Sequence, residues 1–425
     1  MNIFHWSVAP EDATPVQKKN FVNVQVDAVG VGIASAAQPF LPVFLARLGA
    51  SNAQVGLLTT MPALTGMILA LFVGRFLQTR KNIIPWFSRA RFTGIACYAL
   101  TGLMPFIVPR DYVVPAVLAV WAFATLPQTI TNVCFSVVMN AVAGPKGRYE
   151  LMSRRWSVLG LTTAITVALV GQALDRIGFP VNYQIVFIVL SLGGFITLYY
   201  SGSIVIPDNE RATRPLDAPI SERLTAYFGS IRGERPFISF LTKRLIYMSG
   251  SALSLPLFPL YFVREVNASD WWIGVITTGQ TAIQLLGFYI WMRLSKRRGS
   301  RFVLLATALG LALYPAFTAL TLRVELIVFY AALAGIFQAG LDLVFFDELM
   351  KTVPPKRSAT FVSVAQMMEY FPRIIAPILG TLLANYIGLG GGLLVSASLR
   401  LLGFALFALD LPTSTVAKQA VLEKN

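Results

Sequence analysis

The segment "PFLPVFLARLGASNAQVGLLTT" (residues 39–60) has a counterpart later in the chain, "PLFPLYFVREVNASDWWIGVITT" (residues 256–278). With one inserted residue, six positions of the first copy match the second: Pro39, Pro42, Arg47, Gly56, Thr59 and Thr60 match Pro256, Pro259, Arg264, Gly274, Thr277 and Thr278. Each copy consists of two apolar stretches joined by a short polar turn. The chain therefore repeats one apolar helical hairpin, and the repeat indicates an internal duplication.

The composition indicates a membrane protein. The chain has 425 residues, of which 56% are apolar and 13% are charged, whereas soluble domains have about 25% charged residues. A helix that crosses a bilayer needs about 20 mostly apolar residues. Stretches of this kind predict twelve spans, at 22–45, 53–75, 90–109, 112–141, 156–174, 183–206, 237–263, 271–292, 302–321, 325–350, 360–386 and 390–410.

The basic residues are distributed asymmetrically. The chain has 35 Lys and Arg against 20 Asp and Glu, and most of the basic residues fall in every second connection. The opposite connections hold Arg47, Arg110, Arg176, Arg264 and Arg323. This asymmetry predicts a multi-pass protein of the plasma or inner membrane with both termini in the cytoplasm. The basic face attracts anionic lipids, so the charge gives no reason to expect a nucleic-acid partner.

Few residues could support catalysis or metal binding. Cys97 and Cys134 lie in apolar spans, and the single histidine, His5, lies in the N-terminal tail. A metal site or a nucleophilic site built from His and Cys is therefore not expected. The sequence predicts no enzyme activity, no cofactor and no metal.

The duplication also predicts the arrangement of the two halves. Six spans separate the two hairpins, so both copies enter the membrane in the same orientation. A second set of matches supports this, since Gln128 and Asn132 correspond to Gln338 and Asp342. The predicted units are an N-terminal six-helix bundle (1–206), a cytoplasmic linker with a short amphipathic helix (207–236), a C-terminal six-helix bundle (237–412) and a cytoplasmic tail (413–425).

Two basic turns, "VGRFLQTRKN" (73–82) and "WMRLSKRRGS" (291–300), follow the second and eighth spans. Together with twelve spans in two parallel halves, they resemble the major facilitator superfamily of secondary transporters. The family signature of the first turn is Gly-x-Leu-Ala-Asp-Arg-x-Gly-Arg-Lys; here Phe76 replaces the Asp, and the closing Arg80 and Lys81 remain. We assign to cytoplasmic gate loops Arg75, Arg80, Lys81, Arg293 and Arg298. The resemblance implies that the first, fourth, seventh and tenth spans surround a central cavity.

Polar side chains are costly in a membrane and are expected to face a cavity or a partner. The first span has Asn23, Asp27 and Gln38 on roughly one side, and the fourth repeats amides and hydroxyls at every fourth position. The predicted substrate and proton cavity is lined by Asn23, Asp27, Gln38, Gln128, Asn132, Ser136, Tyr247, Gln338 and Asp342. An alternative for Asp27 is a structural hydrogen bond to Asn132. Glu369 and Arg373, four residues apart, form a candidate ion pair, with a contact from Arg373 to Asp342 as the alternative.

These features favour a secondary transporter that moves a small organic solute by alternating access. Protons are a candidate coupling ion, because a carboxyl group removed from water binds protons more readily. Asp27 and Asp342 are the candidate proton sites. The amide-rich set favours a neutral or amphipathic solute. The alternatives are a carrier-fold lipid scramblase and a membrane sensor that does not transport.

Overall fold

The computed structural model describes residues 13–78, 80–206, 233–352 and 358–409. The chain is helical in these parts, and they contain no strand. The N-terminal half consists of α1 (Pro15–Ser35), α2 (Phe40–Arg47), α3 (Asn52–Gln78), α4 (Ile84–Ile107), a 3-10 turn (Arg110–Tyr112), α5 (Val113–Arg176), α6 (Val181–Ser191) and α7 (Gly193–Gly202). The C-terminal half consists of α9 (Arg235–Ser254), α10 (Leu257–Arg264), α11 (Asp270–Arg298), α12 (Ser300–Ala319), α13 (Val324–Thr352) and α14 (Ser358–Ala408).

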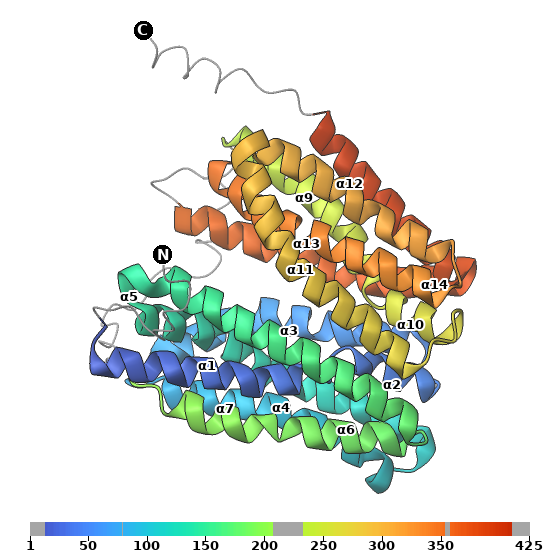
Figure 1. Cartoon of the computed structure of the whole chain (residues 1–425), viewed down its shortest axis with the longest axis horizontal. Helices are drawn as coiled ribbons and strands as arrows, with labels where there is room; N and C mark the ends of the chain where they lie inside the picture. Colours follow the sequence, from blue (N-terminus) through green and yellow to red (C-terminus); the bar gives the residue numbers. More distant parts are fainter. Residues whose placement is uncertain (1–12, 79, 207–232, 353–357, 410–425) are drawn as a thin grey trace.

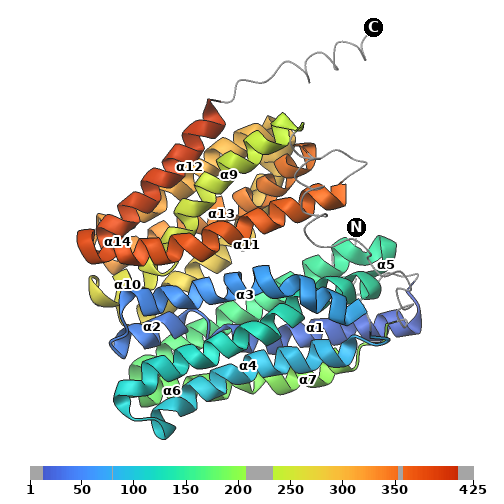
Figure 2. The same ribbon diagram turned by 180° about the vertical axis from the view of Figure 1, so that it is seen from behind.

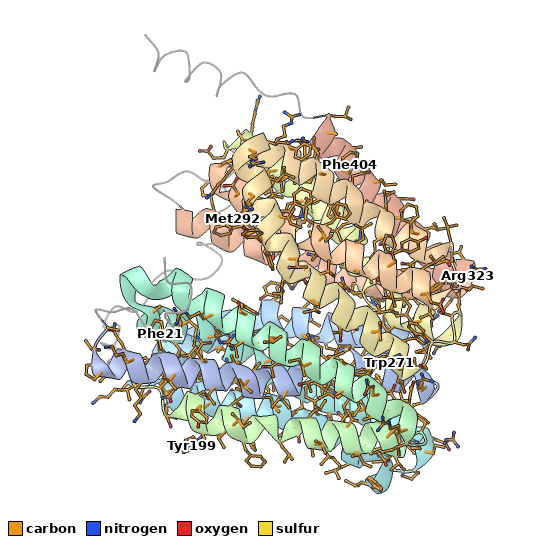
Figure 3. The ribbon with its side chains drawn as sticks, in the orientation of Figure 1. Phe21, Tyr199, Trp271, Met292, Arg323 and Phe404 are labelled. Carbon is orange, nitrogen blue, oxygen red and sulfur yellow. The ribbon has the colours of Figure 1, made fainter. Side chains whose placement is uncertain are left out.

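The helices have the length and surface of membrane spans. In the described parts, ten helices are long and apolar enough to cross a bilayer. The outward faces expose large apolar side chains, such as Phe106 and Phe195, and Tyr199 points away from its bundle (Figure 3). So much exposed apolar surface is unusual for a soluble protein and is expected where lipid covers it. The predicted all-helical membrane fold is confirmed, and the twelve predicted spans are consistent with these helices.

The two halves form separate bundles that lie side by side (Figures 1 and 2). Three helix pairs connect them: α3 packs on α14, α5 on α11, and α2 on α10. The pair α2 and α10 belongs to the repeated hairpins, so these hairpins meet each other at one end of the molecule. We call this end, where α2 and α10 meet, the closed end. The opposite end, where α1 and α9 begin and where the two bundles diverge (Figures 1 and 2), is called the open end.

The repeated prolines lie where two spans break. Helix α1 ends at Ser35, and α2 starts after Pro39; helix α9 ends at Ser254, and α10 starts after Pro256. Proline lacks a backbone N–H and disrupts the helix before it. The repeated prolines thus mark equivalent breaks in the two halves.

The repeated glycines lie at the contacts between the two bundles. A Cβ atom added at Gly56 would lie 3.1 Å from the Thr381 hydroxyl oxygen on α14, and one added at Gly274 would lie 3.3 Å from Gly171 on α5. A larger side chain would push the helices apart at either position. Each glycine therefore permits the close approach of α3 to α14, or of α11 to α5.

Several sequence predictions fall outside the described residues. These are the linker helix expected within 207–232, the C-terminal tail, and the side chains of Arg75 and Ser136.

Candidate functional site: a cavity between the bundles

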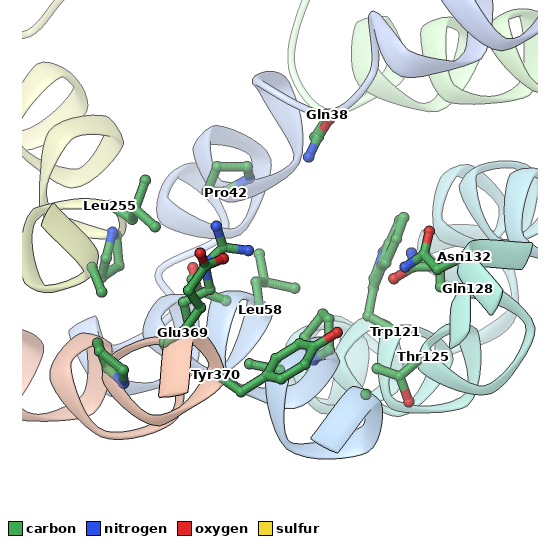
Figure 4. A pocket seen from close by; sticks show the side chains of 18 of the residues that line it. Gln38, Pro42, Leu58, Trp121, Thr125, Gln128, Asn132, Leu255, Glu369 and Tyr370 are labelled. Atoms are coloured by element: carbon green, nitrogen blue, oxygen red, sulfur yellow. The ribbon is translucent and has the colours of Figure 1, made fainter. Parts of the chain in front are cut away.

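A cavity of about 780 Å³ lies between the two bundles. Residues of α3, α4 and α5 line one wall, and residues of α9, α13 and α14 line the other. Figure 4 shows Trp121, Gln128 and Asn132 on one helix, with Glu369 and Tyr370 on a helix of the other bundle. A volume of this size is in the range of small-molecule binding sites.

The N-terminal wall carries neutral polar groups. Gln128 and Asn132 are four residues apart on α5, so their side chains share one face of the helix. The nearby hydroxyls of Thr125 and Thr129 donate to the carbonyls of Ala122 and Thr125, at 2.7 and 2.8 Å. Because these hydroxyls are engaged with their own helix, the two carboxamides are the main hydrogen-bonding groups that α5 offers to a solute.

The C-terminal wall carries the matching pair with one charge. Gln338 and Asp342 line the cavity from α13. Gln338 Nε2 donates to Asp342 Oδ1 at 2.7 Å, and Gln284 Nε2 of α11 donates to Oδ2 at 3.3 Å. Both copies of the repeated motif thus face the same cavity, with Asn132 on one wall and Asp342 on the other.

The predicted ion pair between Glu369 and Arg373 is wrong. Glu369 pairs with Arg244, which lies on α9 and stacks over the Phe345 ring at 5.2 Å. Arg373 lies one turn further along α14 and lines the cavity. Among the described residues, none forms an ion pair or a hydrogen bond with the Arg373 side chain. The α-helical spacing of Glu369 and Arg373 allowed a contact, but the partner on the neighbouring helix takes the carboxylate.

Asp27 is not on the cavity wall, and the prediction that it lines the cavity is wrong. Its side chain is fully buried inside the N-terminal bundle, where Arg91 Nη1 lies 2.5 Å and Arg155 Nη2 lies 3.6 Å from Oδ2. The alternative partner, Asn132, is not used. Arg91 and Arg155, which lie close to basic connections in the sequence, are also buried. A lone carboxylate between two buried guanidinium groups is a structural counter-ion, since its removal would leave both cations uncompensated.

Asn23 and Tyr247 also lie inside their bundles, so their predicted places on the cavity wall are wrong. Asn23 Nδ2 donates to the backbone carbonyl of Ser203 at 3.0 Å and ties α1 to the end of α7. The Tyr247 hydroxyl donates to the backbone carbonyl of Ala308 at 2.9 Å. The buried side-chain donors of Asn23 and Tyr247 would be costly to leave unpaired, and these contacts satisfy them. Of the remaining cavity predictions, Gln38 lies on the wall.

The cavity also has aromatic side chains that the sequence pattern did not identify. Tyr98, Trp121 and Tyr370 line it. Trp121 Nε1 donates to the Thr101 hydroxyl at 3.0 Å, which fixes the indole against α4. Aromatic residues are common throughout the spans, so their spacing alone could not distinguish the cavity wall from the lipid face.

The basic residues assigned to the gate loops lie towards the open end. Arg80 stacks on Phe76 and Trp86, at 4.4 and 5.4 Å from the ring centres. Arg293 stacks on Tyr289, and Arg298 stacks on Phe302. Each of these contacts stays within one bundle. Lys81 is exposed.

Two arginines from the repeated hairpins join the bundles at the closed end. Arg47 donates through Nε and Nη2 to Asp270 Oδ1, at 3.1 and 2.9 Å, and through Nη2 to the carbonyl of Ala268 at 3.2 Å. Its repeat partner Arg264 donates through Nη1 to Asn52 Oδ1 at 2.5 Å and through Nη2 to the carbonyl of Ala50. Ala50 and Asn52 hold the same places in the first hairpin as Ala268 and Asp270 in the second. The two contacts are therefore reciprocal, each hairpin reaching the other at equivalent atoms.

The reciprocity extends along the interface. The Thr60 hydroxyl of α3 donates to the carbonyl of Ile374 on α14 at 3.3 Å, and the matching Thr278 hydroxyl of α11 donates to the carbonyl of Ala164 on α5 at 3.2 Å. An approximate two-fold relation between the halves thus holds at the level of single hydrogen bonds. We call these contacts, together with those of Arg47 and Arg264, the reciprocal seal.

Comparisons with known proteins agree with this fold. The family model described as Major Facilitator Superfamily matches residues 240–424. No curated protein matches the chain significantly. A mutant of the nucleoside transporter NupG superposes with a TM-score of 0.71 at 11% identity and covers 92% of this chain and 99% of its own.

Two further solved structures have the same architecture. A bacterial homologue of the human lysosomal transporter Spinster, in an inward-facing and unoccupied conformation, gives a TM-score of 0.68 at 13% identity, covering 93% of this chain and 97% of its own. The xylose transporter XylE from E. coli, in an inward-open conformation, gives a TM-score of 0.63 at 12% identity, covering 93% of this chain and 95% of its own. The family model thus matches the C-terminal part of the chain, the solved structures have the same fold over almost its whole length, and the apolar helices indicate a multi-pass membrane protein.

Proposed function

We propose that this protein is a secondary transporter that moves a small organic solute across the plasma or inner membrane by alternating access. The observation that carries the proposal is the cavity between two bundles together with the reciprocal seal at one end of it. Two bundles that rock about a central site open one end while closing the other. A duplicated seal made of a few polar contacts is suited to opening without loss of the bundle cores.

The direction of the open end follows from the charge pattern. The open end carries the basic turns, which the distribution of Lys and Arg places in the cytoplasm. On this basis the conformation is inward-facing, with the seal on the outer side. The exposed Arg80, Lys81 and Arg293 would then meet anionic headgroups of the inner leaflet.

Asp342 is the candidate proton site. It lies on the cavity wall and is held by neutral amides, whereas Glu369 is paired with Arg244. A coupling ion must change the balance between the two conformations, and a carboxylate at the interface of the bundles is placed to do so. Asp27 has no such role, because its charge is balanced within one bundle.

The experiment is solute counterflow in vesicles that contain the purified protein. A solute identified by its effect on thermal stability is loaded inside, and entry of the labelled solute is measured. We expect saturable counterflow. Redistribution of labelled lipid without solute flux would instead support a scramblase, and binding without any flux would support a sensor; either result contradicts the proposal.

Alternating access is tested by locking the seal. Arg47→Cys and Asp270→Cys are combined and joined with a short bifunctional thiol reagent, while the natural Cys97 and Cys134 are both buried. We expect cross-linking to stop counterflow, and a cleavable reagent to restore it after reduction. Each single variant treated in the same way is the control. Flux that continues through the cross-linked protein would exclude a rocking mechanism.

A further inference from the structure

The two walls of the cavity differ in charge. Among the described lining residues, those of the N-terminal bundle are neutral, and the charged ones are Asp342, Glu369 and Arg373 of the C-terminal bundle. This asymmetry means that any charge recognition of a solute involves α13 and α14. The N-terminal wall contributes carboxamides and the rings of Tyr98 and Trp121.

Arg373 has no counter-ion among the described residues. The neighbouring carboxylate of Glu369 is engaged with Arg244, and no described residue donates to, accepts from or pairs with the Arg373 side chain. A guanidinium group in a cavity with low-dielectric walls attracts an anion, and its planar fork fits a carboxylate through two parallel hydrogen bonds. The exposed guanidinium of Arg373 on the cavity wall is therefore a position at which a carboxylate can bind.

Asp342 is an anion without a paired cation among the described residues. Its two oxygens accept hydrogen bonds from Gln338 and Gln284. The other titratable groups on the cavity wall are Tyr98, Tyr370 and the ion-paired Glu369. The charged and titratable groups on the middle portions of the helices packed against α13 are Lys243, Arg244 and Tyr247 of α9, Tyr289 and Arg293 of α11, and Tyr314 of α12.

Among the described residues, the charges of the cavity wall and of Arg244, the partner of Glu369, sum to zero. Arg244 compensates Glu369, and on the described cavity wall the remaining cation, Arg373, is matched in charge by the separate Asp342. Adding one anion alone leaves a net negative charge, and adding one proton alone leaves a net positive charge. Adding both restores neutrality. An uncompensated charge is costly to enclose in a membrane protein. The bundles are therefore expected to close around the cavity more readily when it holds neither the anion nor the proton, or both, than when it holds one of them.

We propose that the transported solute is an organic monocarboxylate whose carboxylate binds Arg373, and that a proton on Asp342 travels with it. This inference rests on the proposed transport function and names its substrate class. The cavity volume of about 780 Å³ and its three aromatic rings fit a small carboxylate with an aromatic or heterocyclic body. The amides of Gln128 and Asn132 contact the polar atoms of that body. The neutral or amphipathic solute expected from the sequence is thereby replaced by an anionic one.

Binding to the purified full-length protein tests the carboxylate. The probes are acids paired with their amides: benzoate with benzamide, nicotinate with nicotinamide, and a wider set of aliphatic and aromatic pairs, measured by calorimetry. We expect at least one acid to bind about 30-fold or more tightly than its amide, the factor that corresponds to losing one partner of a desolvated charge pair. Amides that bind as tightly as the acids, or a set in which no acid binds, would overturn the proposal.

Two variants assign the effect to Arg373. Arg373→Gln is expected to weaken binding of the preferred acid by about 30-fold and to leave binding of its amide unchanged. Arg373→Lys is expected to keep part of the preference for the acid over the amide. Arg323→Gln, at an exposed position between α12 and α13, is the matched control. The melting temperature reports whether each variant folds, and the acid-to-amide comparison in the unmodified protein stands without them. Unchanged acid affinity in folded Arg373→Gln would contradict the assignment.

The proton is tested separately. Calorimetry at pH 7 in two buffers with different ionisation enthalpies gives the number of protons taken up with the acid. We expect uptake in the unmodified protein and none in Asp342→Asn. Acid binding without uptake would remove the proton from the proposal and leave the Arg373 site.

The outcomes separate this inference from the proposed function. Acid binding at Arg373 without counterflow would support the site and contradict transport. Counterflow of a neutral solute that is unaffected by Arg373→Gln would support transport and contradict the monocarboxylate.

Discussion

The two copies of the reciprocal seal share their geometry but not their chemistry. Arg47 meets the carboxylate of Asp270, which also accepts a hydrogen bond from the Tyr183 hydroxyl at 2.5 Å. Arg264 meets the carboxamide of Asn52, which donates in turn to Asn385 Oδ1 at 2.8 Å. The first copy is ionic, and the carboxylate side chain is only 7% exposed. The second copy is neutral at the acceptor, and Arg264 is exposed.

This difference indicates that both halves keep the contacts at equivalent positions, but that one copy of the arginine contact is stronger than the other. A charge-assisted hydrogen bond shielded from water is stronger than an exposed one to a neutral oxygen. We therefore expect the closed end to depend mainly on the Arg47 copy. The Arg264 copy then mainly maintains the register between the hairpins.

The largest effect is expected for Arg47→Gln. Removing the Arg47 guanidinium leaves the buried Asp270 carboxylate with Tyr183 and without a cation. This should destabilise the contact at the closed end by about 2–5 kcal/mol. The measurement is the labelling rate of a cysteine introduced at the cavity position Gln38, by a membrane-impermeant maleimide added from the side of the closed end; the natural Cys97 and Cys134 are buried. We expect labelling to rise strongly. Arg323→Gln is the control, and an unchanged rate in Arg47→Gln would show that the ionic copy does not hold the seal.

Arg264→Gln should have a smaller effect in the same assay. It removes hydrogen bonds from an exposed guanidinium to neutral oxygens, for which about 1–2 kcal/mol is expected. Labelling should increase less than in Arg47→Gln, and the two variants together should approach the sum of their separate effects if the copies act independently. If Arg264→Gln opens the closed end more than Arg47→Gln does, the two copies must be ranked the other way.

The hairpins and the general fold could be predicted because they depend on residues repeated in the sequence. Pro39, Arg47 and Gly56 recur at matched places, and each has a structural reason to do so. The difference between Asn52 and Asp270 also lies in the sequence, but its meaning depends on which residues face each other across the bundles. That information is three-dimensional, since Arg47 contacts the other half of the chain and not its own hairpin.

The cavity could be predicted only in part. Gln128, Asn132, Gln338 and Asp342 lie on its walls, whereas Asp27 does not. A carboxylate in a span must have a partner, but the sequence does not show whether this partner is a solute or a buried arginine. Arg91 and Arg155 lie close to basic connections in the sequence, so the charge pattern could not reveal that they reach inward to Asp27.

Asn52→Asp should make the neutral copy resemble the ionic one. It places a carboxylate opposite Arg264, and about 0.5–1 kcal/mol of additional stability is expected for an exposed pair. The contact to Asn385 can be kept if that amide turns its nitrogen towards the new carboxylate. In the labelling assay the rate should fall slightly below that of the unmodified protein, and the fall should be lost in Asn52→Asp combined with Arg264→Gln. A rise would mean that the donation to Asn385 matters more than the added charge pair.

The smallest effects are expected where the two copies still agree. Thr60 and Thr278 each donate to a backbone carbonyl of the other bundle, at 3.3 and 3.2 Å. Thr60→Val and Thr278→Val keep the side-chain shape and remove one neutral hydrogen bond, worth about 0.5–1.5 kcal/mol. Since donor, acceptor and geometry are alike, the two variants should change the labelling rate by similar factors. Markedly unequal factors would show that equivalent hydrogen bonds in the two halves stabilise the closed end to different degrees. The difference between the two arginine contacts could then not be attributed to Asp270 alone.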